Sequence, residues 1–348
     1  MSAVAEPIAR PRKKVLKRAP KDYSQVLRRW MQGAFLALNV WIGVQFYLWV
    51  RYFETGGASR EVARPAGVEG WLPIASLMNL KVLLRTGEIP RLHPAGMFLL
   101  IAFVAASWIF RKSFCGWLCP VGTASEYLWR MGRRILKRNF RLPRWLDIAL
   151  RSLKYVLLGL FVFAVGSMSV AAIREFLGGP YGVVDDVKML NFFRLLGVSG
   201  GIVIALLVFA SVLVQNFWCR YLCPYGALMG IFSMASPLRI RRNRDLCVDC
   251  GKCTRACPSA LPVAQLITIQ SAECTACMQC VAVCPAADAL FLSAPRSKRV
   301  PAWVVAAGVA AIFLGVCGWA QWTGHWDTNL PARVYFDLVP RANEFTHP

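Results

Sequence analysis

The chain has 348 residues, 57% of which are hydrophobic, and it carries a formal net charge of +23 at pH 7. Soluble globular domains are usually about 45–50% apolar, so this balance indicates long apolar segments separated by basic loops, as in membrane proteins. Basic charge is also typical of nucleic-acid-binding proteins, but these have no need of long uncharged apolar segments. Eight of the thirteen cysteines follow a regular spacing typical of metal ligands. Soluble enzymes, disordered chains and secreted disulfide scaffolds are therefore excluded.

Five apolar segments are long enough to cross about 30 Å of hydrocarbon, which takes roughly 20 helical residues. In chain order these segments are 31–50, 92–110, 155–173, 195–218 and 301–324. A shorter apolar stretch, 71–84, contains a lysine and predicts a helix that lies in the membrane interface. We therefore expect an all-α transmembrane bundle of five spans.

The basic residues predict the orientation of the spans. Thirty Lys and Arg lie in residues 1–30, 111–154 and 219–300, against eleven in the other loops and the tail. Because basic loops stay on the cytoplasmic side, the N-terminus is expected in the cytoplasm, and five spans place the C-terminus in the periplasm. Membrane topology and attraction to anionic lipid account for the high positive charge of the chain, so no nucleic-acid partner is needed to explain it.

The most specific motif lies between the fourth and fifth apolar segments. Two CxxCxxCxxxCP runs, at 247–258 and 274–285, have the spacing of bacterial two-cluster ferredoxins, in which the last cysteine of each run binds the other cluster. The first [4Fe–4S] cluster is thus predicted on Cys247, Cys250, Cys253 and Cys284. The second is predicted on Cys274, Cys277, Cys280 and Cys257. Two structural zinc sites are the alternative, but such sites usually combine CxxC pairs or include histidine, and residues 94–324 contain none.

A second motif, CxxxCPxG, occurs where the second and fourth apolar segments reach the cytoplasmic side. Its copies contain Cys115 with Cys119 and Cys219 with Cys223, and the surrounding residues repeat, which indicates an internal duplication in parallel orientation. Two helix ends with paired thiols bring four sulfurs together at the membrane edge. Such thiols would hold a metal or a third cluster, cycle between dithiol and disulfide, or pack as small apolar side chains.

The residues around these thiols carry smaller predictions. Proline after each pair disfavours a continuous helix, and Thr123 with Glu126 has capping-box spacing, which predicts that a new helix begins there. Cys317, alone in the fifth segment, is expected in the core. Asp185 and Asp186 are expected to be solvated.

No catalytic residue is established by the pattern, and two weak candidates remain. In a quinol reaction His93 would accept a proton, with Glu88 as a second carrier. The alternative is an ordinary interfacial histidine at a helix start. The chain contains no Walker-type P-loop and no Rossmann fingerprint, so nucleotide-driven chemistry is not expected.

With both cysteine motifs in place, the chain resembles the NapH/NosR/CcoG group of polytopic membrane [4Fe–4S] proteins. The resemblance covers roughly residues 30–300 and rests on the order span, CxxxCP, two spans, CxxxCP and double ferredoxin run. The group includes a quinol-dehydrogenase component of nitrate reductase systems, a nitrous-oxide reductase regulator and a copper-maturation protein. The sequence shows neither the flavin-bearing domain of the regulator nor the immunoglobulin-like domain of the copper-maturation members, and it adds a fifth span and a tail.

The expected organisation has five parts. These are a basic cytoplasmic segment (1–30), a four-span membrane domain (31–218), a cytoplasmic α+β two-cluster ferredoxin-like domain (219–300), a fifth span (301–324) and a periplasmic tail (325–348).

The expected function is that of an inner-membrane, quinol-dehydrogenase-like component. It relays electrons between the clusters and the quinone pool, or a cytoplasmic or periplasmic redox protein. The alternatives are copper-ion reduction for oxidase assembly, since thiolates suit Cu(I), and a redox-sensing or assembly scaffold.

Overall fold

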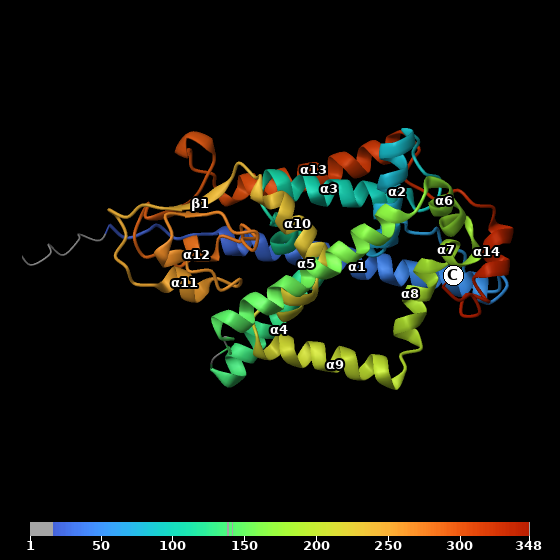
Figure 1. The fold of residues 1–348 in the computed structure, drawn as a ribbon, viewed down its shortest axis with the longest axis horizontal. Helices are drawn as coiled ribbons and strands as arrows, with labels where there is room; N and C mark the ends of the chain where they lie inside the picture. Colours follow the sequence, from blue (N-terminus) through green and yellow to red (C-terminus); the bar gives the residue numbers. More distant parts are fainter. Residues whose placement is uncertain (1–16, 138, 141, 348) are drawn as a thin grey trace, which may run out of the picture.

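The computed structural model describes residues 17–137, 139–140 and 142–347, so the predicted basic segment lies partly outside the described residues. Figure 1 shows a mainly helical molecule in which α1, α3 and α13 run along the long axis. Strand β1 and helices α11 and α12 lie at one end, and α6, α7 and α14 lie at the other. The two ends of the helical bundle therefore carry different structures.

The first half of the chain forms helices separated by short turns. In order these are α1 (Ser24–Glu54), η1 (Ala66–Trp71), α2 (Pro73–Thr86), α3 (Pro94–Ile109), η2 (Phe114–Leu118), α4 (Pro120–Leu136), α5 (Arg144–Ser167), α6 (Val170–Gly178), α7 (Pro180–Val183), α8 (Asp185–Arg194) and α9 (Val198–Leu213).

The second half adds a small sheet before the last long helix. In order the elements are η3 (Trp218–Leu222), α10 (Pro224–Met234), β1 (Arg239–Arg242), α11 (Lys252–Ala256), η4 (Val263–Gln265), β2 (Thr268–Ile269), α12 (Gln279–Ala282), β3 (Leu290–Ser293), η5 (Pro295–Ser297), α13 (Ala302–Trp322) and α14 (Ala332–Leu338).

Three described helices are long and apolar enough to cross a membrane: α1, residues Trp145–Ser167 of α5, and α13. The pair α8 and α9, bent by 82°, adds a fourth if it counts as one span. Helix α3 is apolar but has only 16 residues. Three to four spans are thus supported, and the fifth stays a prediction.

The predicted third segment, 155–173, is misplaced, because α5 begins at Arg144 and ends at Ser167. The Nζ of Lys81 on α2 donates to the carbonyls of Val165, Gly166 and Met168 at 3.0, 2.8 and 2.5 Å. A cation at the free carbonyls of a helix end stabilises that end. Hydropathy alone does not reveal this stop.

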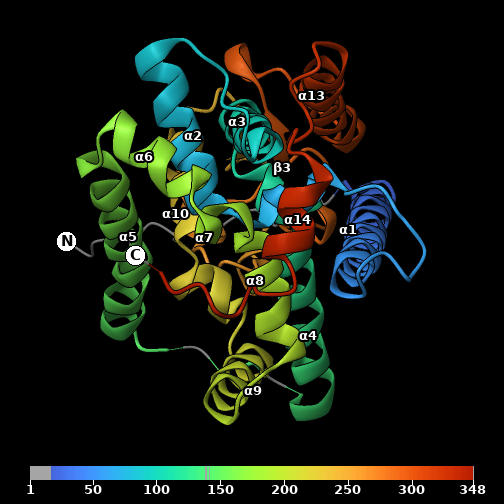
Figure 2. The same ribbon diagram turned by 90° about the vertical axis from the view of Figure 1, so that its right-hand side faces the viewer.

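Figure 2, which looks along the bundle, shows α1, α3, α9 and α13 nearly end-on, whereas α2 lies across them. A helix that lies in the membrane interface runs in this way, across the direction of the membrane-spanning helices. The described helix, Pro73–Thr86, begins with proline at its first position, where the missing N–H costs nothing.

The small sheet has the antiparallel order β2-β1-β3, with Ile240 opposite both Ile269 and Leu292. These three side chains are buried in the same apolar core as Phe103 of α3 and Val309 of α13. The ferredoxin-like part is therefore packed directly on the bundle.

The boundary of the ferredoxin-like part differs from the predicted residue 219. Helix α10 packs against α3 and α5, so the chain leaves the bundle only after Met234. The sheet then begins at β1.

Candidate functional site

The first edge motif forms a single π-helical turn followed by a new helix. The N–H of Cys119 donates to the carbonyl of Phe114 at 2.9 Å, and α4 then begins at Pro120. The Cys119 sulfur accepts a hydrogen bond from the Gly122 N–H at 3.4 Å, so this thiol caps the helix. The second copy repeats these contacts with Cys223, Trp218, Pro224 and Gly226. The internal duplication is thus present in three dimensions.

The predicted capping box is wrong, because Cys119 occupies the cap position. Thr123 lies inside α4, where its hydroxyl donates to the Cys119 carbonyl at 3.0 Å. The Glu126 carboxylate pairs instead with Arg28 of α1. A sulfur cap plays the part of a serine cap with a weaker acceptor, since both present an acceptor to the free N–H groups of the first turn.

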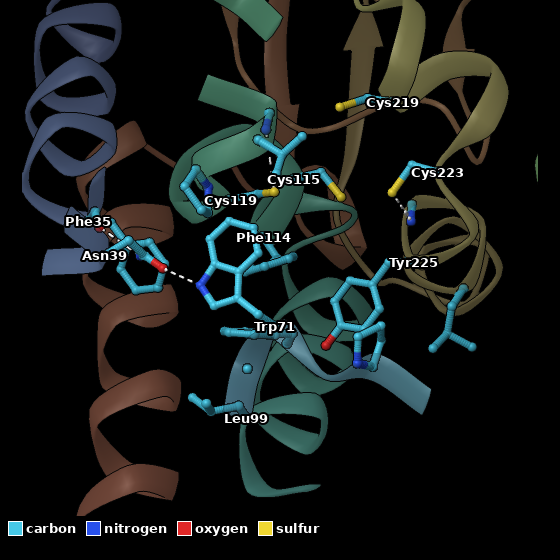
Figure 3. Close-up of a pocket in the computed structure, with 18 of the residues that line it drawn as sticks. Phe35, Asn39, Trp71, Leu99, Phe114, Cys115, Cys119, Cys219, Cys223 and Tyr225 are labelled. Carbon is cyan, nitrogen blue, oxygen red and sulfur yellow. Dashed lines mark hydrogen bonds between the residues drawn. The ribbon is translucent and has the colours of Figure 1, made fainter. Parts of the chain in front are cut away.

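The four edge thiols line one cavity of about 960 Å³. Figure 3 shows the sulfurs of Cys115, Cys119, Cys219 and Cys223 at the same end of this cavity. Burial raises the pKa of the Cys115 thiol to about 11. As free thiols these groups are therefore neutral, and they become thiolates when they bind a metal.

Two buried lysines add positive charge beside the thiols. The Nζ atoms of Lys112 and Lys154 lie 3.5 and 2.5 Å from the carboxylate of Glu273. Burial lowers the pKa of Lys112, but the acidic groups that face it, with Glu273 first, together outweigh burial and hold that pKa above its usual range. Two buried lysine cations pair with a single carboxylate, so the group carries one positive charge in excess in the interior. An anionic metal–thiolate centre would balance that charge, whereas neutral thiols or a disulfide would not.

The electrostatic interactions among the ferredoxin-type cysteines follow the predicted crossed pattern in part, since Cys280 interacts with Cys277, Cys257 and Cys274 but also with Cys253. The Cys284 thiol interacts electrostatically with those of Cys253, Cys247 and Cys250. The Cys257 thiol interacts with those of Cys277 and Cys274. Burial raises the pKa of Cys257 to about 12.

Within the described residues, no three His, Cys, Asp or Glu side chains are close enough to share one metal ion. The four thiolates that hold a [4Fe–4S] cubane lie farther apart than the ligands of a single metal ion, because each thiolate binds a different iron. The spacing of these thiols therefore suits iron–sulfur clusters better than single zinc ions, while the number of clusters and their ligands stay predictions.

The second cysteine group lies against the first edge turn. The Trp117 Nε1 donates to the Ala276 carbonyl at 3.1 Å. A Cβ built on Gly116 would lie 2.9 Å from the Thr275 carbonyl oxygen, so glycine allows this close approach. The Gln25 amide of α1 donates to the Cys277 carbonyl at 2.8 Å. Loop 275–277 is thus held directly on the membrane-edge motif.

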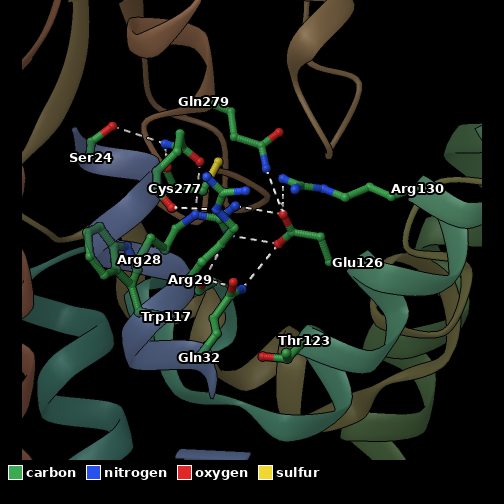
Figure 4. Close-up of polar contacts among 12 residues, drawn as sticks. Ser24, Arg28, Arg29, Gln32, Trp117, Thr123, Glu126, Arg130, Cys277 and Gln279 are labelled. Atoms are coloured by element: carbon green, nitrogen blue, oxygen red, sulfur yellow. Dashed lines mark hydrogen bonds and ion pairs between the residues drawn. The ribbon is translucent and has the colours of Figure 1, made fainter. Parts of the chain in front are cut away.

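A buried network of charged and polar side chains joins the first edge turn to the second cysteine group (Figure 4). The Arg28 guanidinium donates to both carboxylate oxygens of Glu126, at 2.7 and 2.6 Å, and to the Gly116 carbonyl at 3.1 Å. Glu126 also accepts hydrogen bonds from Gln32 and, at 2.9 Å, from Gln279 of α12. Helices α1, α4 and α12 therefore meet on one carboxylate. No periodic pattern singles out Arg28, because its partner Glu126 lies 98 residues along the chain.

Beyond the thiols the cavity is apolar. Phe35, Leu99, Phe103 and Phe313 are among the residues that line it. The Trp71 Nε1 donates to the Asn39 side-chain oxygen at 3.2 Å, and in Figure 3 this pair lies between the edge thiols and Leu99. Cys317 also lines this cavity, in addition to packing in the core as predicted. A largely apolar space with a few polar groups suits an apolar ligand with a polar head group.

Comparisons with known proteins agree with this layout. A family model described as a 4Fe-4S binding domain matches residues 92–143 and 196–244, and one described as a 4Fe-4S dicluster domain matches residues 239–285. The ferredoxin-type protein NapH of Haemophilus influenzae is 26% identical over 54% of this chain and 64% of NapH. The regulatory protein NosR of Pseudomonas aeruginosa is 28% identical over 53% of this chain and 25% of NosR.

YccM of Escherichia coli (strain K12), which is named as a candidate electron transport protein, is 47% identical over 92% of this chain and 91% of YccM. The chain belongs to the NapH/NosR-type membrane 4Fe–4S ferredoxin family. It is thus an iron–sulfur protein of electron transport with membrane-spanning helices. No solved structure matches it.

In this NapH/NosR-type protein the two weak catalytic candidates lie apart from each other. Glu88 is exposed and pairs with Arg174 at 2.5 Å. His93 is buried just before α3, with its Nδ1 3.5 Å from Glu69 and its Nε2 3.5 Å from Asp185. A catalytic role for either stays a prediction, and Glu69 is a neighbour that sequence reasoning missed.

The expectation that Asp186 is solvated is wrong, because Arg64 binds it at 2.6 Å in the interior. Arg64 also binds Glu69 at 2.8 Å. Burial raises the pKa of Glu69, but the charge of Arg64 and hydrogen bonding with His93 outweigh burial and lower that pKa to about 2. This outer polar group is therefore held together by charge.

The close approach at Gly116 leads to a specific expectation. Replacing Gly116 by valine will push loop 275–277 off the edge turn and destabilise the protein by about 1–3 kcal/mol, as overpacking does. Thermal unfolding of the detergent-solubilised protein measures this loss. The matched control is Gly33→Ala on α1, where a Cβ meets nothing within 4 Å. Equal unfolding temperatures for G116V and the control would show that the contact carries no stability.

Proposed function

We propose that this protein relays electrons between its iron–sulfur clusters and the quinone pool of a bacterial inner membrane. The observation that carries the proposal is the cavity, which joins the edge thiols to an apolar space among α1, α3 and α13. A quinone has an apolar tail and a polar head group, and such a space matches both.

The crossed cysteine groups would hold the two clusters. The first consists of Cys247, Cys250, Cys253 and Cys284, and the second of Cys274, Cys277, Cys280 and Cys257. Such clusters store and exchange single electrons. Cys115, Cys119, Cys219 and Cys223 would hold a third iron–sulfur cluster, whose thiolates are spaced more widely than the ligands of a single metal ion. The buried lysines beside them support an anionic centre there.

The arrangement along the molecule supports an electron path in which the second cysteine group, the edge thiols and the cavity follow one another. The second group lies against the edge turn through Trp117 and Gly116, and the edge thiols open on the cavity. The ferredoxin-like part and α14 lie at opposite ends in Figure 1, which agrees with a cytoplasmic ferredoxin domain and a periplasmic C-terminus. Because the hydrocarbon core is about 30 Å thick, a mobile quinone is the simplest carrier towards the far side.

This function is tested by a substitution that fills the cavity with a larger side chain. Leu99 of α3 is buried and lines it, and Leu99→Trp will slow electron exchange with a menaquinone analogue by about tenfold or more, equivalent to at least about 1.4 kcal/mol. The control is Leu160→Trp, since Leu160 of α5 is exposed outside the cavity. Cluster EPR signals must be unchanged in both variants. Unaltered exchange in L99W with the cavity filled would contradict the proposal.

A further inference from the structure

The two cysteine groups differ in their surroundings. Cys257, Cys277 and Cys280 of the second group are buried, whereas Cys250 of the first is exposed. The first group is thus open to solvent and the second faces the bundle. An electron relay whose first cysteine group is exposed to solvent meets its redox partner there, so we expect a partner protein on this side of the molecule.

We propose that the surface around the first group is a docking site for an acidic, soluble one-electron carrier protein. This surface, called the basic face below, consists of Lys17, Arg18, Leu246, Cys250, Lys252, Arg255 and Val283. The inference rests on the proposed relay function and names the kind of partner that the relay meets on this side.

Two chain segments supply the charge of the basic face. Lys252 and Arg255 are exposed on α11, immediately beside Cys253. Lys17 and Arg18 are exposed on a segment held along residues 285–287 by two backbone hydrogen bonds, from Ala19 N–H to the Pro285 carbonyl and from Ala287 N–H to the Lys17 carbonyl. This segment therefore runs beside Cys284, the fourth member of the first group.

Acidic residues do not cancel this charge. Asp249 is exposed but pairs with Arg242 at 3.3 Å, and Asp245 is exposed nearby. The basic face therefore keeps a net positive charge of its own. Complementary charge steers association and fixes the orientation of partners.

An apolar centre accompanies the charge. Leu246 and Val283, which flank the ligand positions Cys247 and Cys284, are 44% and 39% exposed. A small apolar patch with a charged rim is the usual composition of a protein interface, and redox partners use small interfaces of less than about 1,200 Å².

Lipid is not the occupant that the geometry favours. Figure 1 places α11 and α12 at the end of the molecule beyond the long helices, whereas headgroups surround the ends of those helices. Docking here brings the carrier next to Cys250. One electron lost by the carrier is then one electron gained by this protein, and the reverse transfer restores both.

The test measures binding, with a purified acidic plant-type [2Fe–2S] ferredoxin as the probe and the full detergent-solubilised protein immobilised. At about 50 mM salt we expect saturable binding that weakens by about tenfold or more at about 300 mM salt. The double variant Lys252→Glu/Arg255→Glu should weaken binding by a similar factor. The control is Arg296→Glu/Lys298→Glu, which reverses two exposed cations outside the basic face.

Each outcome has one meaning. Loss of binding in K252E/R255E with retention in the control supports the docking site. No binding at low salt, equal loss in both variants, or salt-dependent self-association of the protein through this face overturns it. The quinone assay on K252E/R255E separates the two proposals, because normal quinone exchange without docking removes this inference and leaves the relay function standing.

Discussion

Replacing Cys115 and Cys219 together by serine is expected to remove the metal centre that we propose at the membrane edge and to leave the ferredoxin-type clusters in place. The change removes one sulfur from each copy of the duplicated turn, and both sulfurs belong to thiols that line the cavity. We expect a lower metal content per chain, an unchanged EPR signal from the two clusters, and at least about tenfold slower quinone exchange.

The matched control for this variant is Cys317→Ser. Cys317 lines the same cavity from α13 but belongs to neither edge motif, so its replacement should not change the metal content. Full metal content in the double serine variant would show that the edge thiols only pack. Normal quinone exchange with loss of copper-dependent oxidase maturation would favour copper reduction instead.

Arg28→Gln will destabilise the junction between the bundle and the ferredoxin-like part by about 3 kcal/mol. Removing one partner of a buried ion pair costs about 3–5 kcal/mol, and the lower end applies because Arg130 still binds Glu126 at 2.5 Å. A lower unfolding temperature and a weaker EPR signal from the second cluster are the expected results.

Arg29→Gln is the control, since Arg29 is exposed and its side chain donates to the Gln25 carbonyl rather than to Glu126. Arg28→Met/Glu126→Gln should recover much of the lost stability, because no unpaired buried charge remains. Identical stability of R28Q and R29Q would mean that the network does not hold the junction.

The sequence predicted the edge turns and the meeting of their thiols because the determinants are local, whereas the cluster ligands stay predictions. The CxxCxxCxxxCP and CxxxCP spacings place thiols on turns whatever the rest of the chain does, and the structure brings the edge thiols to one cavity. Proline after each pair ended the turns as expected.

The contacts that join distant segments were not predictable. Arg28 and Glu126 are 98 residues apart, and each reads as an ordinary surface charge until α1 and α4 are packed together. Glu126 was assigned to a capping box for that reason, and Asp186 was assigned to solvent because its partner Arg64 lies 122 residues earlier. The end of α5 was missed because the Lys81 side chain that caps it comes from another helix.

Electron exchange between the reduced clusters and quinone is measured directly in a single-turnover experiment. The purified protein is reduced anaerobically, freed of reductant and mixed with a menaquinone analogue in detergent or liposomes, while EPR follows the clusters. The account predicts that the signals of the reduced clusters disappear as quinol forms, with two electrons recovered for each quinol. Reduced clusters that persist in the presence of every quinone tested, at potentials where transfer is downhill, would contradict it.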